Sequence, residues 1–111
     1  MKRFVYTLEL REESVDEYVE YHKNVWKEVE ADVTAAGIID MEIYLLGTRL
    51  FSIVEASDDF DPENSMKNYA TCDRVVEWDE LMAKFQVPVK EAKSHEWWAK
   101  MDCVYKKQRA E

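Results

Sequence analysis

Cysteine and histidine are scarce in this sequence, and their positions argue against a metal centre. The two cysteines, Cys72 and Cys103, are far apart and match neither a zinc-ligand spacing nor a redox Cys-x-x-Cys motif. No local spacing of carboxylates completes a ligand set around the two histidines, His22 and His95, and the acidic stretch 58–61 lacks the EF-hand pattern. We therefore expect no metal, and two ordinary buried thiols in a reducing compartment.

Long apolar runs and an excess of basic residues are also missing. No stretch approaches the length that crosses a bilayer, and the N-terminal segment 1–10 alternates instead of forming the apolar part of a signal peptide. The 24 acidic residues outnumber the 15 basic ones, which gives a net charge of −9. This charge disfavours nucleic acids, anionic membranes and strongly anionic substrates, which need basic contact surfaces. We expect a cytoplasmic protein with a neutral ligand and no nucleic-acid or membrane partner.

Motifs for phosphate binding, dinucleotide binding and a nucleophile elbow are absent as well. The chain is instead rich in aromatic side chains, at 13% of residues, within a hydrophobic content of 47%. That content is enough for a packed core, and 111 residues fit one domain covering positions 1–111. The aromatic excess indicates that the protein binds something flat or has an aromatic-rich dimer surface.

Hydrophobic periodicity predicts the element order strand, helix, strand, strand, helix, strand. The predicted strands cover residues 2–10, 38–46, 49–56 and about 97–106. The second and third strands are joined by a hairpin turn at Gly47 and Thr48.

Two helical regions separate these strands. The first begins at a capping-box pair, Ser14 and Glu17, and continues up to Gly37, which ends it in a left-handed conformation. The second covers about residues 62–86, with Asp61 as its cap.

This order is the ferredoxin-like βαββαβ arrangement of the α+β class, in which a four-stranded antiparallel sheet carries two helices on one face. The opposite face would then carry large side chains from several strands. An exposed apolar patch of that size usually marks an interface. We therefore predict a homodimer that packs sheet against sheet as a dimeric α/β barrel.

The most informative stretch lies inside the first helical region. Tyr18, His22 and Trp26 are four residues apart, so a continuous helix places them on one face. A proton-transfer group between two flat aromatic surfaces suits a polyhydroxy ligand such as a sugar. Aromatic residues at this spacing, and a lone histidine among them, are also typical of a core, and both interpretations stay open.

Four further aromatic residues are candidate ligand contacts. Trp97 and Trp98 are neighbours on a predicted strand, so they should face opposite sides, one toward the helices and one toward the dimer interface. Trp78 belongs to the apolar stripe of the second helix, where a core position is the leading alternative. Tyr44 lies on the second strand, and its face depends on a register that the pattern does not determine.

The segment 18–29 resembles the first-helix signature of the L-rhamnose mutarotase family. Segments 37–44 and 49–51 also resemble that family, and 76–86 is similar to its second helix. The likeness covers nearly the whole chain, and the Tyr-x-x-x-His-x-x-x-Trp run is its most specific part. The resemblance implies a dimeric ferredoxin-like fold without metal or organic cofactor. It also implies interconversion of the α and β anomers of a deoxysugar such as L-rhamnose or L-fucose.

By this resemblance His22 is the catalytic proton donor and Tyr18 contacts the substrate. Two family contacts are absent, because some members have a tyrosine where this chain has Met41 and a tryptophan pair near Val75 and Val76. The candidates to replace them are Trp78, Trp97 and Trp98.

Mutarotation needs a group that gives and takes protons near neutral pH, and histidine has a suitable unperturbed pKa. We expect His22 to protonate the ring oxygen or to exchange protons with the anomeric hydroxyl. Tyr18 would hold a sugar hydroxyl and share in proton transfer, and Trp26 would supply a stacking wall or support His22. Two other functions remain open: a non-catalytic small-ligand-binding or regulatory module, and a cofactor-free monooxygenase on the same dimeric fold.

Overall fold

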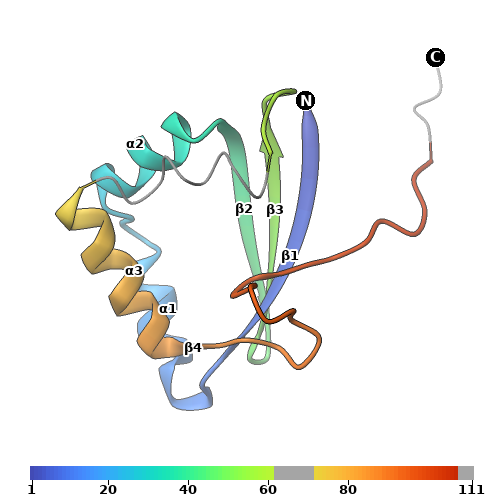
Figure 1. The fold of residues 1–111 in the computed structure, drawn as a ribbon. Coiled ribbons are helices and arrows are strands. Elements are labelled where there is room, and N and C mark those ends of the chain that lie inside the picture. The colour runs from blue at the N-terminus through green and yellow to red at the C-terminus, as the bar shows by residue number, and fades with distance from the viewer. Residues whose placement is uncertain (62–71, 108–111) are drawn as a thin grey trace.

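The computed structural model describes residues 1–61 and 72–107, which build an antiparallel sheet with helices on one side (Figure 1). Its strands are β1 (Lys2–Leu10), β2 (Ile38–Leu46), β3 (Arg49–Ala56), β4 (Gln86–Val87) and β5 (Ala99–Lys100). Its helices are the 3-10 turn η1 (Glu12–Ser14) and the α-helices α1 (Val15–Tyr21), α2 (Lys27–Ala35) and α3 (Asp73–Phe85). Among the described residues, no helix combines the length and the apolar character that crossing a bilayer requires.

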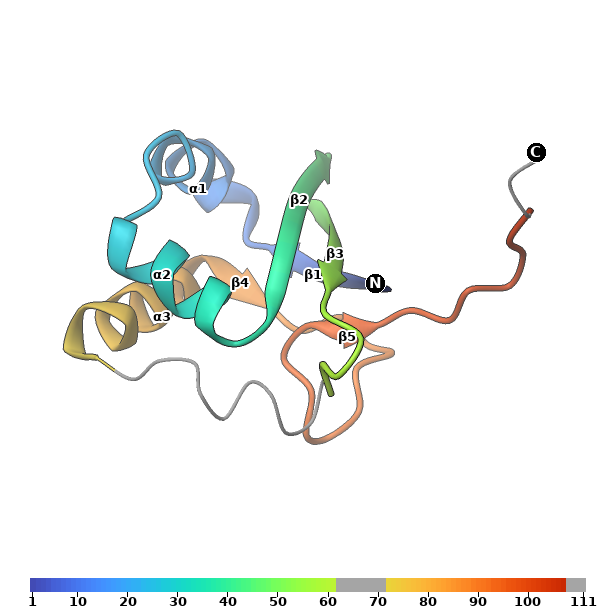
Figure 2. The same cartoon turned by 90° about the horizontal axis from the view of Figure 1, so that it is seen from above.

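The order across the sheet is β2-β3-β1-β4, and β5 also pairs with β1. The central pair runs antiparallel from Lys2 opposite Ala56 to Glu9 opposite Arg49. Seen from above, the helices lie together on one face of this sheet (Figure 2). The arrangement confirms the predicted α+β, ferredoxin-like fold.

On the side of β1 that faces away from β3, two short strands, β4 and β5, take the place of one long strand. β4 pairs with the end of β1 at Leu10, and β5 pairs further back, at Tyr6 and Thr7. The prediction of one strand over residues 97–106 is therefore wrong in its extent.

Beyond β5 the chain leaves the sheet as an extended arm of residues 101–107 (Figure 1). The Met101 N–H still donates to the Val5 carbonyl at 2.7 Å, but Val104 and Tyr105 are 96% and 78% exposed. Alternation predicts a strand from side chains alone, whereas a strand also needs a neighbour to pair its backbone groups. After Met101, residues 102–106 make no backbone hydrogen bond to another strand among the described residues.

The first helical region is broken at residues 22–26. α1 ends at Tyr21, and Trp26 has an extended backbone, with φ −60° and ψ 135°, immediately before α2 begins at Lys27. The prediction of one continuous helix is wrong because His, Asn, Val and Trp are mediocre helix formers. In addition, Val25 and Trp26 pack against the main core from this connection.

The helix ends agree with the prediction at one place and differ at another. Ser14 makes no side-chain capping hydrogen bond, so the capping box with Glu17 is wrong. Its backbone, at φ −104° and ψ −3°, is already close to helical because η1 precedes it, whereas a capping serine normally has an extended backbone. Gly37 follows the end of α2 with φ +102°, as predicted.

The main core lies between the helices and the inner face of the sheet. On α3 the residues Val75, Trp78, Met82 and Phe85 are buried at helical spacing, which confirms the predicted stripe. They pack with Leu8, Leu10, Tyr18, Val29 and Leu50. A second cluster joins Ile38, Val54, Ala56 and Phe60. The predicted start of the second helical region at residues 61–62 extends into residues 62–71, which lie outside the described residues.

Two glycines with left-handed backbones allow a matched stability test. Gly37 has φ +102°, and a Cβ there would lie 3.1 Å from Ser57 Oγ and 3.4 Å from the ring of Phe60. Gly47 has φ +62°, and a Cβ there would meet no described atom within 4 Å. We expect Gly37→Ala to lower the free energy of unfolding by about 2–3 kcal/mol, and Gly47→Ala by about 1 kcal/mol. Urea unfolding followed by tryptophan fluorescence measures both, and equal losses would contradict the crowding at Gly37.

Candidate active site

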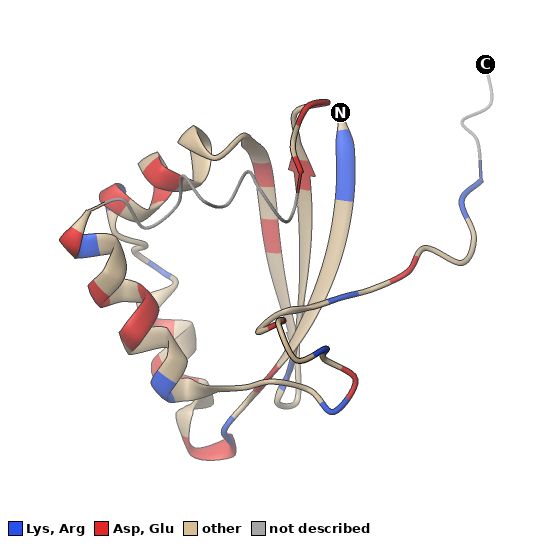
Figure 3. Ribbon diagram, viewed as in Figure 1, with Lys and Arg blue, Asp and Glu red and all other residues tan. Residues whose placement is uncertain are grey.

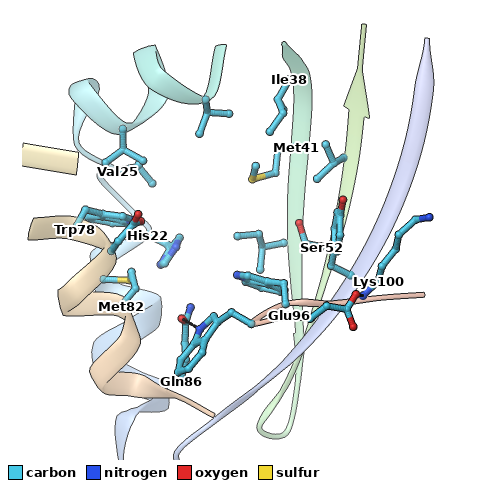
Figure 4. Close-up of a pocket in the computed structure, with 18 of the residues that line it drawn as sticks. His22, Val25, Ile38, Met41, Ser52, Trp78, Met82, Gln86, Glu96 and Lys100 are labelled. Atoms are coloured by element: carbon cyan, nitrogen blue, oxygen red, sulfur yellow. Dashed lines mark hydrogen bonds between the residues drawn. The ribbon is translucent and has the colours of Figure 1, made fainter. Parts of the chain in front are cut away.

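A large hollow lies between the helices and the inner face of the sheet (Figure 4). Its volume of about 1960 Å³ leaves ample room for a hexose, since ligand pockets typically measure about 300–1,000 Å³. The helices and the α1–α2 connection contribute Tyr18, His22, Val25, Val29, Trp78 and Met82. The sheet contributes Tyr6, Met41, Ile43, Ser52, Val54 and Gln86, and the connection to β5 contributes Glu96, Trp97 and Trp98.

His22 stands at the C-terminal end of α1 with its half-buried ring beside this hollow. Its Nδ1 lies 2.9 Å from the carbonyl oxygen of Tyr18. Because a carbonyl only accepts, Nδ1 carries the hydrogen, and the neutral ring has its lone pair on Nε2. Burial lowers the pKa of His22 below its ordinary 6.5, and the backbone hydrogen bond to Tyr18 opposes this shift. At neutral pH the ring is therefore a base that acts through Nε2.

Tyr18 lies one turn before His22, and their ring centroids are 4.2 Å apart. Tyr18 is only 3% exposed and borders the hollow. Burial raises the pKa of Tyr18 to about 12, and a side-chain hydrogen bond with Gln86 acts in the opposite direction. Tyr18 is therefore a protonated phenol at neutral pH, next to a neutral imidazole.

Gln86 is the site residue that the sequence analysis missed. It follows α3 directly, pairs opposite Leu10 and is 6% exposed. Its Oε1 accepts a hydrogen bond from Trp97 Nε1–H at 2.8 Å, and its side chain also bonds Tyr18. The only sequence signal is a glutamine directly after an apolar helical stripe, which is common at helix ends. Only the fold shows that this amide reaches the hollow.

Trp78 supports the imidazole from α3. Its ring meets the ring of His22 edge to face, with centroids 5.4 Å apart, and meets Trp26 at 5.1 Å. Trp26 does not line the hollow, and the Arg74 guanidinium lies 3.7 Å above its ring. Because α1 ends at Tyr21, Trp26 does not lie one helical turn after His22, and the two side chains do not share a helix face. Any effect of Trp26 on a ligand would pass through Trp78.

The predicted alternation of Trp97 and Trp98 is wrong, because both residues line the hollow. They lie in a bend before β5, where strand geometry does not apply. Trp98 packs against the main core. Tyr44 pairs opposite Phe51, is 52% exposed and donates to the carboxylate of Glu42. It does not line the hollow.

Acidic residues outnumber basic ones around the hollow, which disfavours an anionic ligand. Acidic residues are also distributed over α2 and α3 (Figure 3). At the sheet side, backbone N–H groups of Lys93 and Lys100 hydrogen-bond Glu96 and lower the pKa of its carboxyl, so it is charged. Burial raises the pKa of Tyr6, and the Glu96 charge adds to the shift.

The described residues contain no group of His, Cys, Asp and Glu side chains that could hold a metal ion. Cys72 and Cys103 are free thiols, and both are exposed, so the prediction of buried thiols is wrong. Cys72 is the residue immediately before α3, and Cys103 lies on the exposed arm, so neither position faces the core.

Comparisons with known proteins identify relatives over most of the chain. The family model for L-rhamnose mutarotase matches residues 3–107. A UPF0734 protein of Dictyostelium discoideum is 45% identical over 97 residues, which cover 84% of this chain and 78% of that protein. The L-fucose mutarotase of Xanthomonas campestris pv. campestris is 33% identical over 90 residues, covering 78% and 72%.

Two solved structures share the fold. The L-rhamnose mutarotase of Formosa agariphila superposes with a TM-score of 0.69 at 17% identity, covering 97% of this chain and 100% of that one. The tetracenomycin F2 cyclase of Streptomyces glaucescens, a type-II polyketide cyclase, superposes with a TM-score of 0.64 at 12% identity, covering 99% and 100%. At these identities the likeness shows the fold alone. The family match over nearly the whole chain shows that this protein belongs to the L-rhamnose mutarotase family, a membership that supports sugar mutarotase activity.

Proposed function

We propose that the protein interconverts the α and β anomers of a deoxysugar of the L-rhamnose or L-fucose type, without a cofactor. The observation that carries this proposal is the pair of Tyr18 and His22 beside the hollow. A phenol that keeps its proton lies next to an imidazole whose Nε2 lone pair has no protein partner among the described residues. The family membership supports the same reaction.

The chemistry follows from the tautomer of His22. Its Nε2 takes the proton of the anomeric O1–H, and the released electron pair forms the C1=O1 double bond. The C1–O5 bond breaks, and O5 leaves with that electron pair and gains a proton. Rotation about C1–C2 exposes the other face of the aldehyde, and the steps reverse. A positioned base of this kind typically contributes about 10²–10⁴-fold.

The walls of the hollow match the surfaces of a deoxysugar. Indole and phenol rings from Trp78, Trp98 and Tyr6 offer flat apolar faces to C–H groups, and the thioether side chain of Met41 adds apolar surface. Ser52 and the charged carboxylate of Glu96 offer hydrogen-bonding partners to sugar hydroxyls. We propose that Trp78 and Trp98 take the place of the tryptophan pair that some family members have near the positions of Val75 and Val76.

Saturation-transfer NMR with L-rhamnose and L-fucose tests the proposal and separates its alternatives. Accelerated exchange between the anomeric signals is expected for at least one sugar. Sugar binding without acceleration would support a binding module instead. If neither sugar binds, and the protein consumes oxygen when a quinol is added, the result would support a monooxygenase.

The pH dependence of this reaction follows from the lowered pKa of His22. Activity requires the neutral ring, so kcat/KM should rise with pH through a value below 6.5 and then stay level across neutral pH. Anomer exchange measured from roughly pH 5 to 8, corrected for the uncatalysed rate, gives the profile. A rise centred above the ordinary histidine pKa would contradict the proposed role of burial.

We further propose a cytoplasmic homodimer that packs through the outer face of the sheet. Tyr44 and Leu46 on that face are 52% and 77% exposed, and the arm of residues 101–107 carries further exposed apolar side chains. A second copy would remove this surface from water. Light scattering and sedimentation measure the oligomeric state directly.

A further inference from the structure

We infer that Gln86 and Trp97 form a hydrogen-bonded clamp that directs the Tyr18 hydroxyl into the hollow, where it donates its proton to the sugar ring oxygen. This inference rests on the proposed mutarotase function and assigns the proton donor that the reaction needs. Gln86 and Trp97 act through Tyr18 and are therefore positioning residues.

The Trp97 indole determines the orientation of the Gln86 amide. An indole N–H can only donate, so Trp97 Nε1, at 2.8 Å, identifies the amide oxygen as the atom that faces it. The amide nitrogen then occupies the opposite side, and the Gln86 side chain lowers the pKa of the Tyr18 phenol, as a hydrogen-bond donor does. An amide NH2 group is a donor, so the phenol oxygen of Tyr18 accepts this bond.

The phenol of Tyr18 still has its own hydrogen to donate. Because the Tyr18 oxygen accepts from Gln86, its own O–H must be directed elsewhere. No carbonyl or carboxylate among the described residues accepts it, and Tyr18 borders the hollow. The phenol therefore presents a donor to a bound ligand, while His22 presents an acceptor at Nε2.

This donor and acceptor match the two proton transfers of ring opening. His22 Nε2 removes the proton from O1, the C1–O5 electron pair moves to O5, and O5 takes the Tyr18 proton. The products are an imidazolium, a phenolate and the neutral open-chain aldehyde, and ring closure returns both protons. The amide N–H of Gln86 also stabilises the transient phenolate, because a hydrogen bond to a charged acceptor is the stronger kind.

The exposure of Trp97 makes the clamp testable. Its side chain is 44% exposed, so Trp97→Phe removes the N–H donor with little loss of packing. We expect kcat for anomer exchange to fall about tenfold with KM within about twofold, since one oriented hydrogen bond is lost. The acid limb of the pH profile should stay in place, because His22 is untouched.

A double-mutant cycle with Tyr18→Phe separates positioning from a general structural effect. In the Tyr18→Phe background there is no hydroxyl to direct, so Trp97→Phe should change kcat by less than about twofold. Gln86→Glu gives a second route with Trp97 intact: its carboxylate accepts the phenol hydrogen and draws it away from the sugar. We expect a larger fall in kcat for Gln86→Glu than for Gln86→Leu.

The outcomes distinguish this inference from the proposed function. A wild-type protein that accelerates neither L-rhamnose nor L-fucose exchange would overturn both. An active wild type in which Trp97→Phe lowers kcat equally in both backgrounds would overturn only the clamp. Equal rates for Gln86→Glu and Gln86→Leu would overturn it as well. Thermal unfolding and circular dichroism confirm that each variant is folded before its rate is compared.

Discussion

Replacing His22 by alanine is expected to lower the catalysed rate of anomer exchange by about 10²–10⁴-fold. The ring is the base of the proposed reaction, and its Nδ1–H bond to the Tyr18 carbonyl holds Nε2 in the form that accepts a proton. Alanine removes this acceptor, and no second imidazole lies beside Tyr18. NMR exchange spectroscopy on L-rhamnose and L-fucose measures the rate against the protein-free reaction.

The chain offers a matched control for this substitution. His95 also borders the hollow, but it is exposed, in the connection before Trp97. We expect His95→Ala to keep the wild-type rate, within about twofold, and the wild-type pH profile. Binding of the sugar by His22→Ala should persist, because the tryptophan walls remain. Undiminished exchange in a folded His22→Ala protein would remove His22 from the mechanism.

Replacing Trp78 by alanine is expected to lower the free energy of unfolding by about 3–5 kcal/mol. Trp78 is 5% exposed and joins the main core to the site, with ring contacts to Tyr21, His22 and Trp26. Removing the indole leaves a cavity in the middle of this cluster. Since domains are stable by only about 5–15 kcal/mol, this loss would remove a large part of the protein's stability.

Two comparisons isolate the contribution of the buried indole. Trp97→Ala removes the same side chain from a position that is 44% exposed, and should cost only about 1 kcal/mol. Trp78→Phe keeps a ring in the core and should recover part of the loss. Urea unfolding curves give the three values. Similar losses for Trp78→Ala and Trp97→Ala would contradict the central role of Trp78.

The predictions that succeeded depend on local pattern. Burial alternates along Arg49–Ala56, and β3 has the predicted bounds because alternation reports directly which side chains a sheet buries. Gly37 and Gly47 have the left-handed backbones that a helix end and a hairpin turn need. The stripe of α3 was readable for the same reason, since helical spacing of large apolar residues requires a buried face.

The predictions that failed depend on partners distant in sequence. The break between α1 and α2 places Trp26 against Trp78 and Arg74, two residues about 50 positions away along the chain. Trp97 and Trp98 face the same hollow because the chain bends before β5, and no local pattern marks that bend. Gln86 was missed because its hydrogen-bond partners, Tyr18 and Trp97, come from opposite ends of the chain.

The sequence by itself determined the element order, the ferredoxin-like topology and the pairing of Tyr18 with His22, because these depend on periodicity and on spacing within one turn of helix. Only the tertiary structure decided which nitrogen of His22 carries the free lone pair, which tryptophans line the hollow, and that Gln86 acts on the Tyr18 phenol. The physical reason is that hydrogen-bond direction and cavity lining are properties of side chains brought together from several elements. A one-dimensional pattern contains the residues of such a site but not their orientation.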